Sequence, residues 1–218
     1  MPSFYLNSYV PLVATDHGRR GRKRFGIPPF VDGSIRREPD LEHRYPSISC
    51  LCRGRNFAPR LEVGDVVAYV TNRRNFGNGP ERRLTAVLRV WKLFDSHDAA
   101  AEWYRDRGLP LPSNCMVQGN PAKPFAQSHG RDSGAEGCSG WDAGYRRRAR
   151  LWGRFVVCRV LWRNLDKTAP VVGHEHFDKA FDGVPSLQNP GRMTMQNLRR
   201  FVRAMRLPIP VPSGQRKG

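Results

Sequence analysis

Four stretches of this sequence have the composition of β-strands, and three of them are longer than ten residues. Leu84–Phe94 and Leu151–Trp162 carry apolar side chains on both faces, Asp65–Thr71 is almost wholly apolar, and Ser3–Val13 is aromatic and β-branched. A flat sheet with one solvated face would show a cleaner alternation of apolar and polar residues. Long strands with two partly apolar faces favour a sheet that curls into a small barrel.

Two helices are expected beside the strands. Ser96 has the properties of an N-cap, since Asp98 follows in the first turn, and the helix continues through Ala99–Arg107. Thr194 begins the second helix, whose apolar residues fall at helical spacing opposite a face of arginines. The apolar residues, which predict core contacts, are Met195, Leu198, Phe201, Val202 and Met205, and the arginines are Arg199, Arg200, Arg203 and Arg206.

Three segments have the composition of irregular structure. They are residues 18–40, residues 121–150 and the tail from Pro208, and the second contains a Gly/Ser run followed by four arginines. Alternating βαβ units are missing, which argues against a doubly wound parallel sheet. We therefore expect one α+β domain over residues 1–207, with an Arg/Gly-rich insertion at about 121–150 and a disordered tail at 208–218.

The charge balance favours a polyanionic partner. The 218 residues contain 37 Lys+Arg against 19 Asp+Glu, for a net charge of +18, and nucleic acid is the commonest partner of such a chain. A GC-rich genome would by itself explain why Arg outnumbers Lys, but it would not explain the shortage of acids. The mean hydropathy is -0.59, and no run approaches the ~20 apolar residues that span a membrane. No signal peptide is recognised, so a cytoplasmic protein without a membrane partner is expected.

The sequence motifs that could bind a metal or supply a catalytic nucleophile are weak. The pairs Cys50/Cys52 and His174/His176 each place two ligands on one face of an extended segment, but zinc sites generally use wider spacings. The five cysteines are expected to be reduced. Neither a G-x-S-x-G motif nor a phosphate-binding glycine pattern occurs. We expect no metal and no cofactor, and the sequence identifies no catalytic residue.

The loop at residues 32–40 combines three acids, two adjacent arginines and a serine. Binding sites often need such a density of polar groups, whereas folding rarely does. Arg36 or Arg37 could hold a phosphate, and Ser34 or Glu38 could contact a base edge. The alternative is a loop whose polar groups bind one another, in which Glu38 and Asp40 pair with the arginines. Both interpretations stay open at this point.

Aromatic residues alternate with the basic segments, as in surfaces that stack bases. They are Phe57, Tyr69, Trp91, Trp103, Phe125, Trp141, Tyr145, Trp152 and Trp162. Trp103 and Trp162 are predicted to be core residues. Trp91 shares a strand face with Arg89 and is a candidate pocket residue. Trp141 lies in a Gly-rich stretch and is a candidate stacking residue.

The segment Phe57–Thr71 contains a Gly64-Asp65 turn into a strand and is followed by the strand Leu84–Phe94 and a short helix. This order resembles the PUA-like superfamily, which includes the ASCH, EVE and YTH domains. The segments 32–42 and 47–53 add a resemblance to the nucleotide-modification-associated domains found near phage and bacterial DNA-modification genes. The resemblance covers about residues 3–108 and, more loosely, 150–205.

The resemblance implies a PUA-like β-barrel with flanking helices that recognises a modified or flipped base in DNA or RNA. The alternative that it implies is an enzyme hydrolysing or otherwise processing a modified nucleotide or nucleoside, and a third hypothesis is a basic protein that coats nucleic acid. An enzyme should hold an ionisable pair inside its pocket, and a coat protein should have no pocket. The predicted base- and nucleic-acid-binding residues are Ser34, Arg36, Arg37, Glu38, Arg53, Trp91, Asn120, Lys123, Trp141, Arg147 and Arg148, with the pocket bordered by the loop at 32–38, Trp91 and the loop at 120–123.

Overall fold

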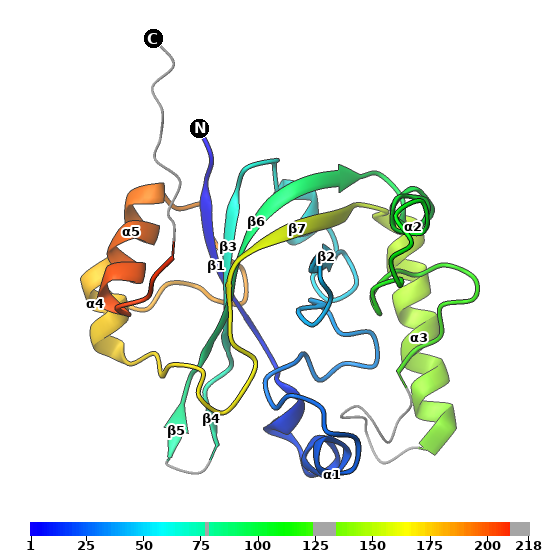
Figure 1. Ribbon diagram of the computed structural model, residues 1–218, viewed down its shortest axis with the longest axis horizontal. Coiled ribbons are helices and arrows are strands. Elements are labelled where there is room, and N and C mark those ends of the chain that lie inside the picture. The colour runs from blue at the N-terminus through cyan, green and yellow to red at the C-terminus, as the bar shows by residue number, and fades with distance from the viewer. Residues whose placement is uncertain (77–78, 124–133, 210–218) are drawn as a thin grey trace.

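The computed structural model describes residues 1–76, 79–123 and 134–209, with only the backbone for 134–141. Its centre is a five-stranded sheet in the order β1-β3-β6-β7-β2. The strands are β1 (Phe4–Tyr9), β2 (Ser47–Ser49), β3 (Val66–Thr71), β6 (Leu84–Phe94) and β7 (Phe155–Arg163). β1 runs parallel to β3, and the other pairs are antiparallel. β6 and β7 bend strongly, so the sheet curls into a half-barrel (Figure 1), and the predicted α+β class with a curled sheet is confirmed.

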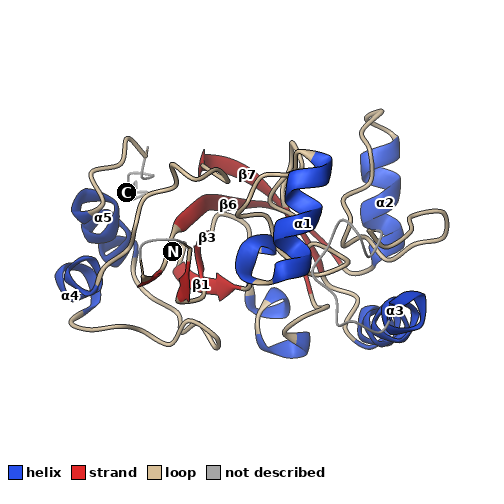
Figure 2. Cartoon of the chain, turned by 90° about the horizontal axis from the view of Figure 1, so that it is seen from below, coloured by secondary structure: helices blue, strands red, loops and turns tan. Residues whose placement is uncertain are grey.

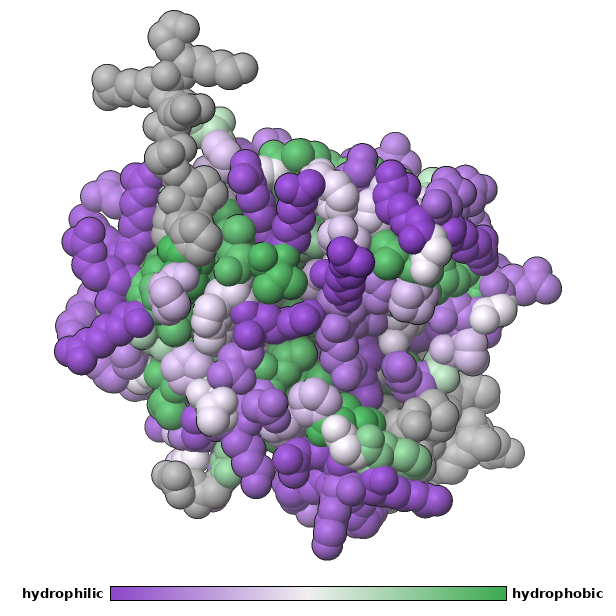
Figure 3. Space-filling model, viewed as in Figure 1, coloured by the Kyte–Doolittle hydropathy of each residue, from purple (hydrophilic) through white to green (hydrophobic). Residues whose placement is uncertain are grey.

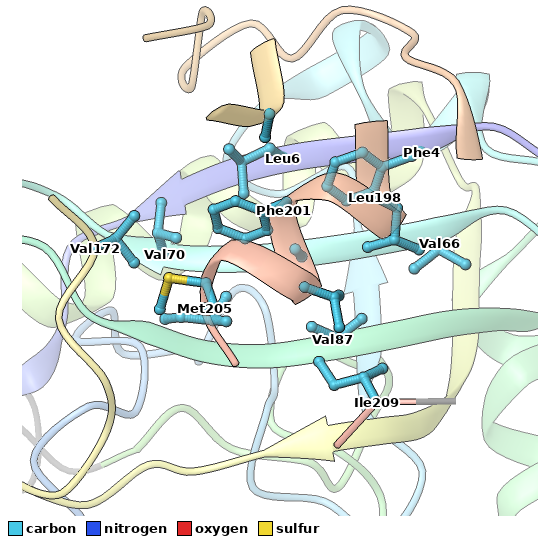
Figure 4. Packing of buried hydrophobic residues seen from close by; sticks show 14 of the residues in the cluster. Phe4, Leu6, Val66, Val70, Val87, Val172, Leu198, Phe201, Met205 and Ile209 are labelled. Atoms are coloured by element: carbon cyan, nitrogen blue, oxygen red, sulfur yellow. The ribbon is translucent and has the colours of Figure 1, made fainter. Parts of the chain in front are cut away.

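Both faces of this sheet are buried, as the apolar strands predict. On one face, alternate residues such as Phe4 and Leu6 of β1 pack against two helices, α4 (His174–Phe181) and α5 (Met195–Ala204). Phe201 of α5 lies over Leu6 in this layer (Figure 4). On the other face, the intervening residues, among them Tyr5 and Tyr9, form a second core. The period-two alternation of a strand divides the two cores.

Three further helices lie on the second side of the sheet, opposite α4 and α5 (Figure 2). They are α1 (Asp16–Phe25), α2 (His97–Arg105) and α3 (Gly134–Leu151). The two predicted N-caps are present, since Ser96 Oγ accepts a hydrogen bond from the Ala99 amide and Thr194 Oγ1 accepts one from the Asn197 amide. Among the described residues, no helix is long and apolar enough to cross a bilayer.

Two of the three segments predicted to be irregular contain helices. In α3, the buried residues Asp142, Tyr145 and Ala149 recur at helical spacing, but the glycines and serines that precede them hid this pattern. In α1, the glycine that suggested a loop permits close packing, because a Cβ at Gly18 would lie 1.6 Å from the Leu12 carbonyl oxygen. The positions expected as strand before residue 155 belong to the end of α3 and a turn.

Other boundaries also differ from the sequence prediction. The first strand ends at Tyr9 and not at Val13. A short hairpin, β4 (Arg74–Asn75) with β5 (Pro80–Glu81), and three 3-10 turns, η1 (Leu12–Ala14), η2 (Gly54–Asn56) and η3 (Ala58–Arg60), were not predicted. The tail predicted to be disordered begins at Pro208, but Ile209 is buried in the core formed with α4 and α5, so that prediction is wrong at its start. The rest of the tail lies outside the described residues.

Candidate ligand-binding cavity

A cavity of about 570 Å³ lies on the second face of the sheet, beside the carboxyl ends of β1 and β3. Its walls come from these two strands, from the loop at 32–39, from the segment after β2 and from α3. Aromatic rings and polar groups share the lining. The rings are Tyr9, Phe57, Tyr69 and Tyr145, and the polar residues include Asn7, Ser8, Asp32, Ser34, Glu38, Ser49 and Arg53.

The parallel pairing of β1 and β3 forms the floor of this cavity. The register places Asn7 directly beside Tyr69, and the alternation along β1 puts Asn7 on the same face as Tyr5 and Tyr9. Asn7 is only 2% exposed. Its Oδ1 atom has no hydrogen-bond partner among the described residues. The Asn7 side chain also hydrogen-bonds to that of Tyr69. A buried acceptor without a partner is rare in folded proteins, so Asn7 Oδ1 is a candidate ligand contact on the floor.

Asp32 begins the loop that forms a side wall. Its Oδ1 atom accepts hydrogen bonds from the backbone amides of Ser34 at 2.8 Å and Glu38 at 2.9 Å. Burial raises the pKa of Asp32 to about 6, although these hydrogen bonds oppose the shift. The same carboxyl therefore shapes the loop and places a titratable group at the cavity.

Glu38 ends this wall and is fixed by β2 and by a neighbouring loop. Its carboxylate accepts hydrogen bonds from the Ser49 amide at 2.9 Å, from the Ser49 hydroxyl and from Asn114 Nδ2 at 2.8 Å. Burial raises the pKa of Glu38 to about 7, and the negative charge of Asp32 acts in the same direction. The cavity thus contains two carboxyl groups that titrate near neutral pH.

Three of the predicted site residues, Ser34, Glu38 and Arg53, lie together in this cavity. The guanidinium of Arg53 donates hydrogen bonds to the carbonyl oxygens of Ser8 and Gln188. Arg53 therefore ties β1 to the loop before α5 and closes that side of the cavity.

Arg36 and Arg37 are buried behind the cavity, with exposures of 1% and 2%. Arg36 forms an ion pair with Asp142 of α3 and donates to the Asn120 carbonyl oxygen at 2.7 Å. Arg37 donates to the Asp32 carbonyl oxygen at 2.9 Å and lies 3.4 Å from a Glu42 carboxylate oxygen. Neither guanidinium faces solvent, so the expectation that one of them holds a phosphate is wrong for this conformation. The alternative, in which the acids of the loop pair with its arginines, is also wrong, because the arginines form ion pairs with Asp142 and Glu42, outside the loop.

Trp91 does not border the cavity, contrary to prediction. Its ring lies 5.3 Å from Tyr45 and 5.4 Å from Trp103, and the guanidinium of Arg159 lies 4.2 Å above it. This aromatic cluster forms under α2. Trp91 follows Val90, which faces the second core, and is the extra residue of β6 where the register with β7 shifts between Val90 and Lys92. Trp103 belongs to the same core, as predicted.

The loop at 120–123 also lies apart from the cavity lining. Asn120 lines a second, polar cavity of about 690 Å³ beside α2 and α3, and its side-chain amide donates to the Pro112 and Cys115 carbonyl oxygens. The Lys123 amide donates to the Ile35 carbonyl oxygen at 2.8 Å. The expected pocket border of Trp91 with residues 120–123 is therefore wrong.

The remaining predicted residues belong to α3. Arg147 is exposed. Arg148 donates to the Leu51 carbonyl oxygen and lies 5.7 Å from the Tyr145 ring. The side chain of Trp141 lies outside the described residues.

The cysteine and histidine pairs lie in separate parts of the fold. Cys50 is buried in the second core, whereas His174 and His176 begin α4. Because residues two apart on a helix point in different directions, the assumption of an extended His-x-His segment is wrong. The part of the chain that the structure describes contains no group of three His, Cys, Asp or Glu side chains placed to hold a metal.

Sequence reasoning did not assign a role to Asn7, the least expected member of the cavity. The available signal was a polar side chain on the inward face of a strand that is otherwise aromatic and apolar. Phe57, Tyr69 and Tyr145 were recognised as aromatics near basic segments, but nothing in the sequence separated them from the core rings. Comparisons with protein-family models, curated proteins and solved structures find no match, so the PUA-like resemblance stays a prediction.

Proposed function

We propose that this protein binds nucleic acid, DNA or RNA, and takes a flipped or modified base into the cavity floored by Asn7 and Tyr69. The observation that carries the proposal is the combination, in one cavity of about 570 Å³, of aromatic walls with a buried Asn7 side chain whose Oδ1 atom has no hydrogen-bond partner among the described residues. That volume is in the ordinary range for small-ligand sites. Flipped bases are recognised by stacking on aromatic side chains and by hydrogen bonds to their edges.

Two basic elements begin at the lining of this cavity. Thr15 lines it and caps α1, whose exposed Arg19 and Arg20 follow within about one turn. Asn72 lines it and is followed directly by the exposed Arg73, which precedes the hairpin. Long hydrophilic side chains project at the lower edge of the molecule, where α1 lies (Figures 1 and 3). These cations support sequence-independent affinity for phosphates around the cavity.

A bulky substitution that fills part of the cavity, called the plug below, tests this proposal. Asn72→Trp places a large side chain at the partly exposed rim, and Gln196→Trp, on the exposed face of α5, is the matched control. We expect the plug to remove the preference among oligonucleotides that differ in one central base, while the control keeps it. Equal preference in the wild type and in both variants would refute a base-binding cavity.

The salt dependence of binding tests the surface separately from the cavity. If about six phosphates of a duplex are neutralised, log K falls against log salt with a slope near −5. Replacing Arg19 and Arg20 with alanine should flatten the slope by about two units if both contact phosphates. Replacing Arg200 and Arg203, which are exposed on α5 across the sheet, should leave the slope unchanged. A flat salt response of the wild type would contradict nucleic-acid binding itself.

The alternative function, hydrolysis of a modified nucleotide or nucleoside, is favoured by the carboxyl pair of Asp32 and Glu38. A carboxyl group with a pKa of about 7 can donate a proton to a leaving group at neutral pH, and one with a pKa of about 6 can accept a proton from water. Incubation with modified nucleosides and oligonucleotides, followed by chromatography of the products, tests this activity. Turnover that Asp32→Asn abolishes would support the enzyme, and binding without any product would exclude it for those substrates.

A further inference from the structure

The inner wall of the cavity has hydrogen-bond acceptors for a ligand, while several of its donors are already engaged. Asn7 Oδ1 is buried and without a partner among the described residues. The carboxyl groups of Asp32 and Glu38 lie in the same lining. A ligand that fills the cavity against these groups has to bring its own N–H donors.

The donors nearby have protein partners. The Ser8 hydroxyl donates to the Leu187 carbonyl oxygen at 3.2 Å, and the Tyr9 hydroxyl donates to the Phe30 carbonyl oxygen. Both terminal nitrogens of Arg53 donate to carbonyl oxygens, and the Ser49 hydroxyl donates to Glu38. A ligand carbonyl directed at this wall would therefore meet acceptors and negative charge, which is unfavourable in a buried site.

We infer that the cavity selects a base with an exocyclic amino group, held by Asn7 Oδ1 from the floor and by the acidic wall at its side. This inference rests on the proposed function and names the ligand class of the same site. Adenine and cytosine present such an amino group on the edge that a flipped base exposes, whereas uracil and thymine present a carbonyl oxygen at the corresponding position. The aromatic walls accept either ring because stacking tolerates every base.

The test uses oligonucleotides that are identical except at one central base. The two comparisons are adenine with purine, which lacks only the amino group, and cytosine with uracil. They are made at pH 8, where both carboxyl groups are ionised. We expect adenine and cytosine to bind about ten-fold more tightly than their counterparts, since a site built for a hydrogen bond rejects the analogue that lacks it. Equal or reversed preference in both comparisons would overturn the inference.

Two variants that each replace a side-chain amide with leucine test whether the preference for adenine over purine arises at Asn7. Asn7→Leu removes the buried acceptor, and we expect the adenine-to-purine ratio to fall several-fold toward one. Gln196→Leu removes a side-chain amide on the exposed face of α5, outside the cavity lining, and we expect the ratio to stay at its wild-type value. A folded Asn7→Leu protein that keeps the full ratio would overturn the role of Asn7. If Asn7→Leu does not fold, the two base comparisons in the wild type decide the inference on their own.

The failure of this inference is distinguishable from failure of the proposed function. A wild-type preference for purine or uracil that the Asn72→Trp plug removes would refute the amino-group rule and keep the base-binding cavity. Binding without any dependence on the central base or on the plug would refute both. A preference for amino-bearing bases that the plug leaves unchanged would place the selectivity outside this cavity and would likewise refute both.

Discussion

The ion pair between Arg36 and Asp142 joins the loop at 32–40 to α3, and its removal should be strongly destabilising. Arg36 Nε lies 2.5 Å from Asp142 Oδ1, and the two side chains are 1% and 11% exposed. Asp142→Ala would leave a buried guanidinium whose other partners include the carbonyl oxygens of Asn120 and Ser113. Removing one partner of a buried pair costs about 3–5 kcal/mol. The second partner of Asp142, the largely exposed Arg146, adds less than about 1 kcal/mol.

Urea denaturation of Asp142→Ala and Arg150→Ala provides the measurement. Arg150 is exposed on the same helix, and its replacement should change the free energy of unfolding by no more than about 0.5 kcal/mol. Asp142→Ala should lower that free energy by about 3 kcal/mol at an unchanged denaturant slope. The double variant Arg36→Met/Asp142→Ala should be more stable than Asp142→Ala, because no charge stays buried without its partner. A loss for Asp142→Ala no larger than that for Arg150→Ala would refute the packing of α3 against the loop.

Two further predictions concern Glu38, which lines the cavity, and Trp91, which does not. The folded state favours protonated Glu38, since burial raises its pKa from 4.5 to about 7. Its stabilising contribution is therefore present below about pH 4.5 and is lost as the pH rises to about 7. Over this interval the free energy of unfolding of the wild type should decrease more than that of Glu38→Gln, and equal decreases would contradict the raised pKa of Glu38. Trp91→Ala should lower the free energy of unfolding by about 2–3 kcal/mol through lost ring packing. It should leave the preference among bases unchanged in the oligonucleotide titration. A stable variant with an altered preference would show that Trp91 belongs to the base-binding site after all.

The four long strands β1, β3, β6 and β7 and two of the five α-helices in the described residues, α2 and α5, could be predicted from the sequence because their signals are local. Leu84–Phe94 has the predicted bounds, since a long apolar run can only be buried, and the caps Ser96 and Thr194 are short-range hydrogen-bond patterns. α1 could not be predicted in the same way. Apart from Phe25, its ten residues are polar or glycine, so it lacks the apolar stripe by which a helix is recognised.

The candidate site was only partly predictable because it depends on pairings between distant segments. The density of charge at residues 32–40 correctly drew attention to the loop, but the direction of each side chain depends on partners such as Asp142, more than a hundred residues away. Asn7 becomes a floor residue only through its register with Tyr69. Trp91 lies outside the site, at the position where the register of β6 with β7 shifts. Neither register nor curvature can be derived from one strand alone.

The division of charge within the loop lets one segment both hold the fold together and line the cavity with acids. The arginines point away from the cavity and have ion pairs with Asp142 and Glu42. Asp32 and Glu38 line the cavity, where hydrogen bonds to amides and a hydroxyl hold them without a full positive charge in direct contact. Desolvation is then the largest influence on their pKa values. If Arg36 or Arg37 paired with these acids directly, both carboxyl groups would titrate well below neutral pH, and the cavity would contain neutralised ion pairs in place of acceptors.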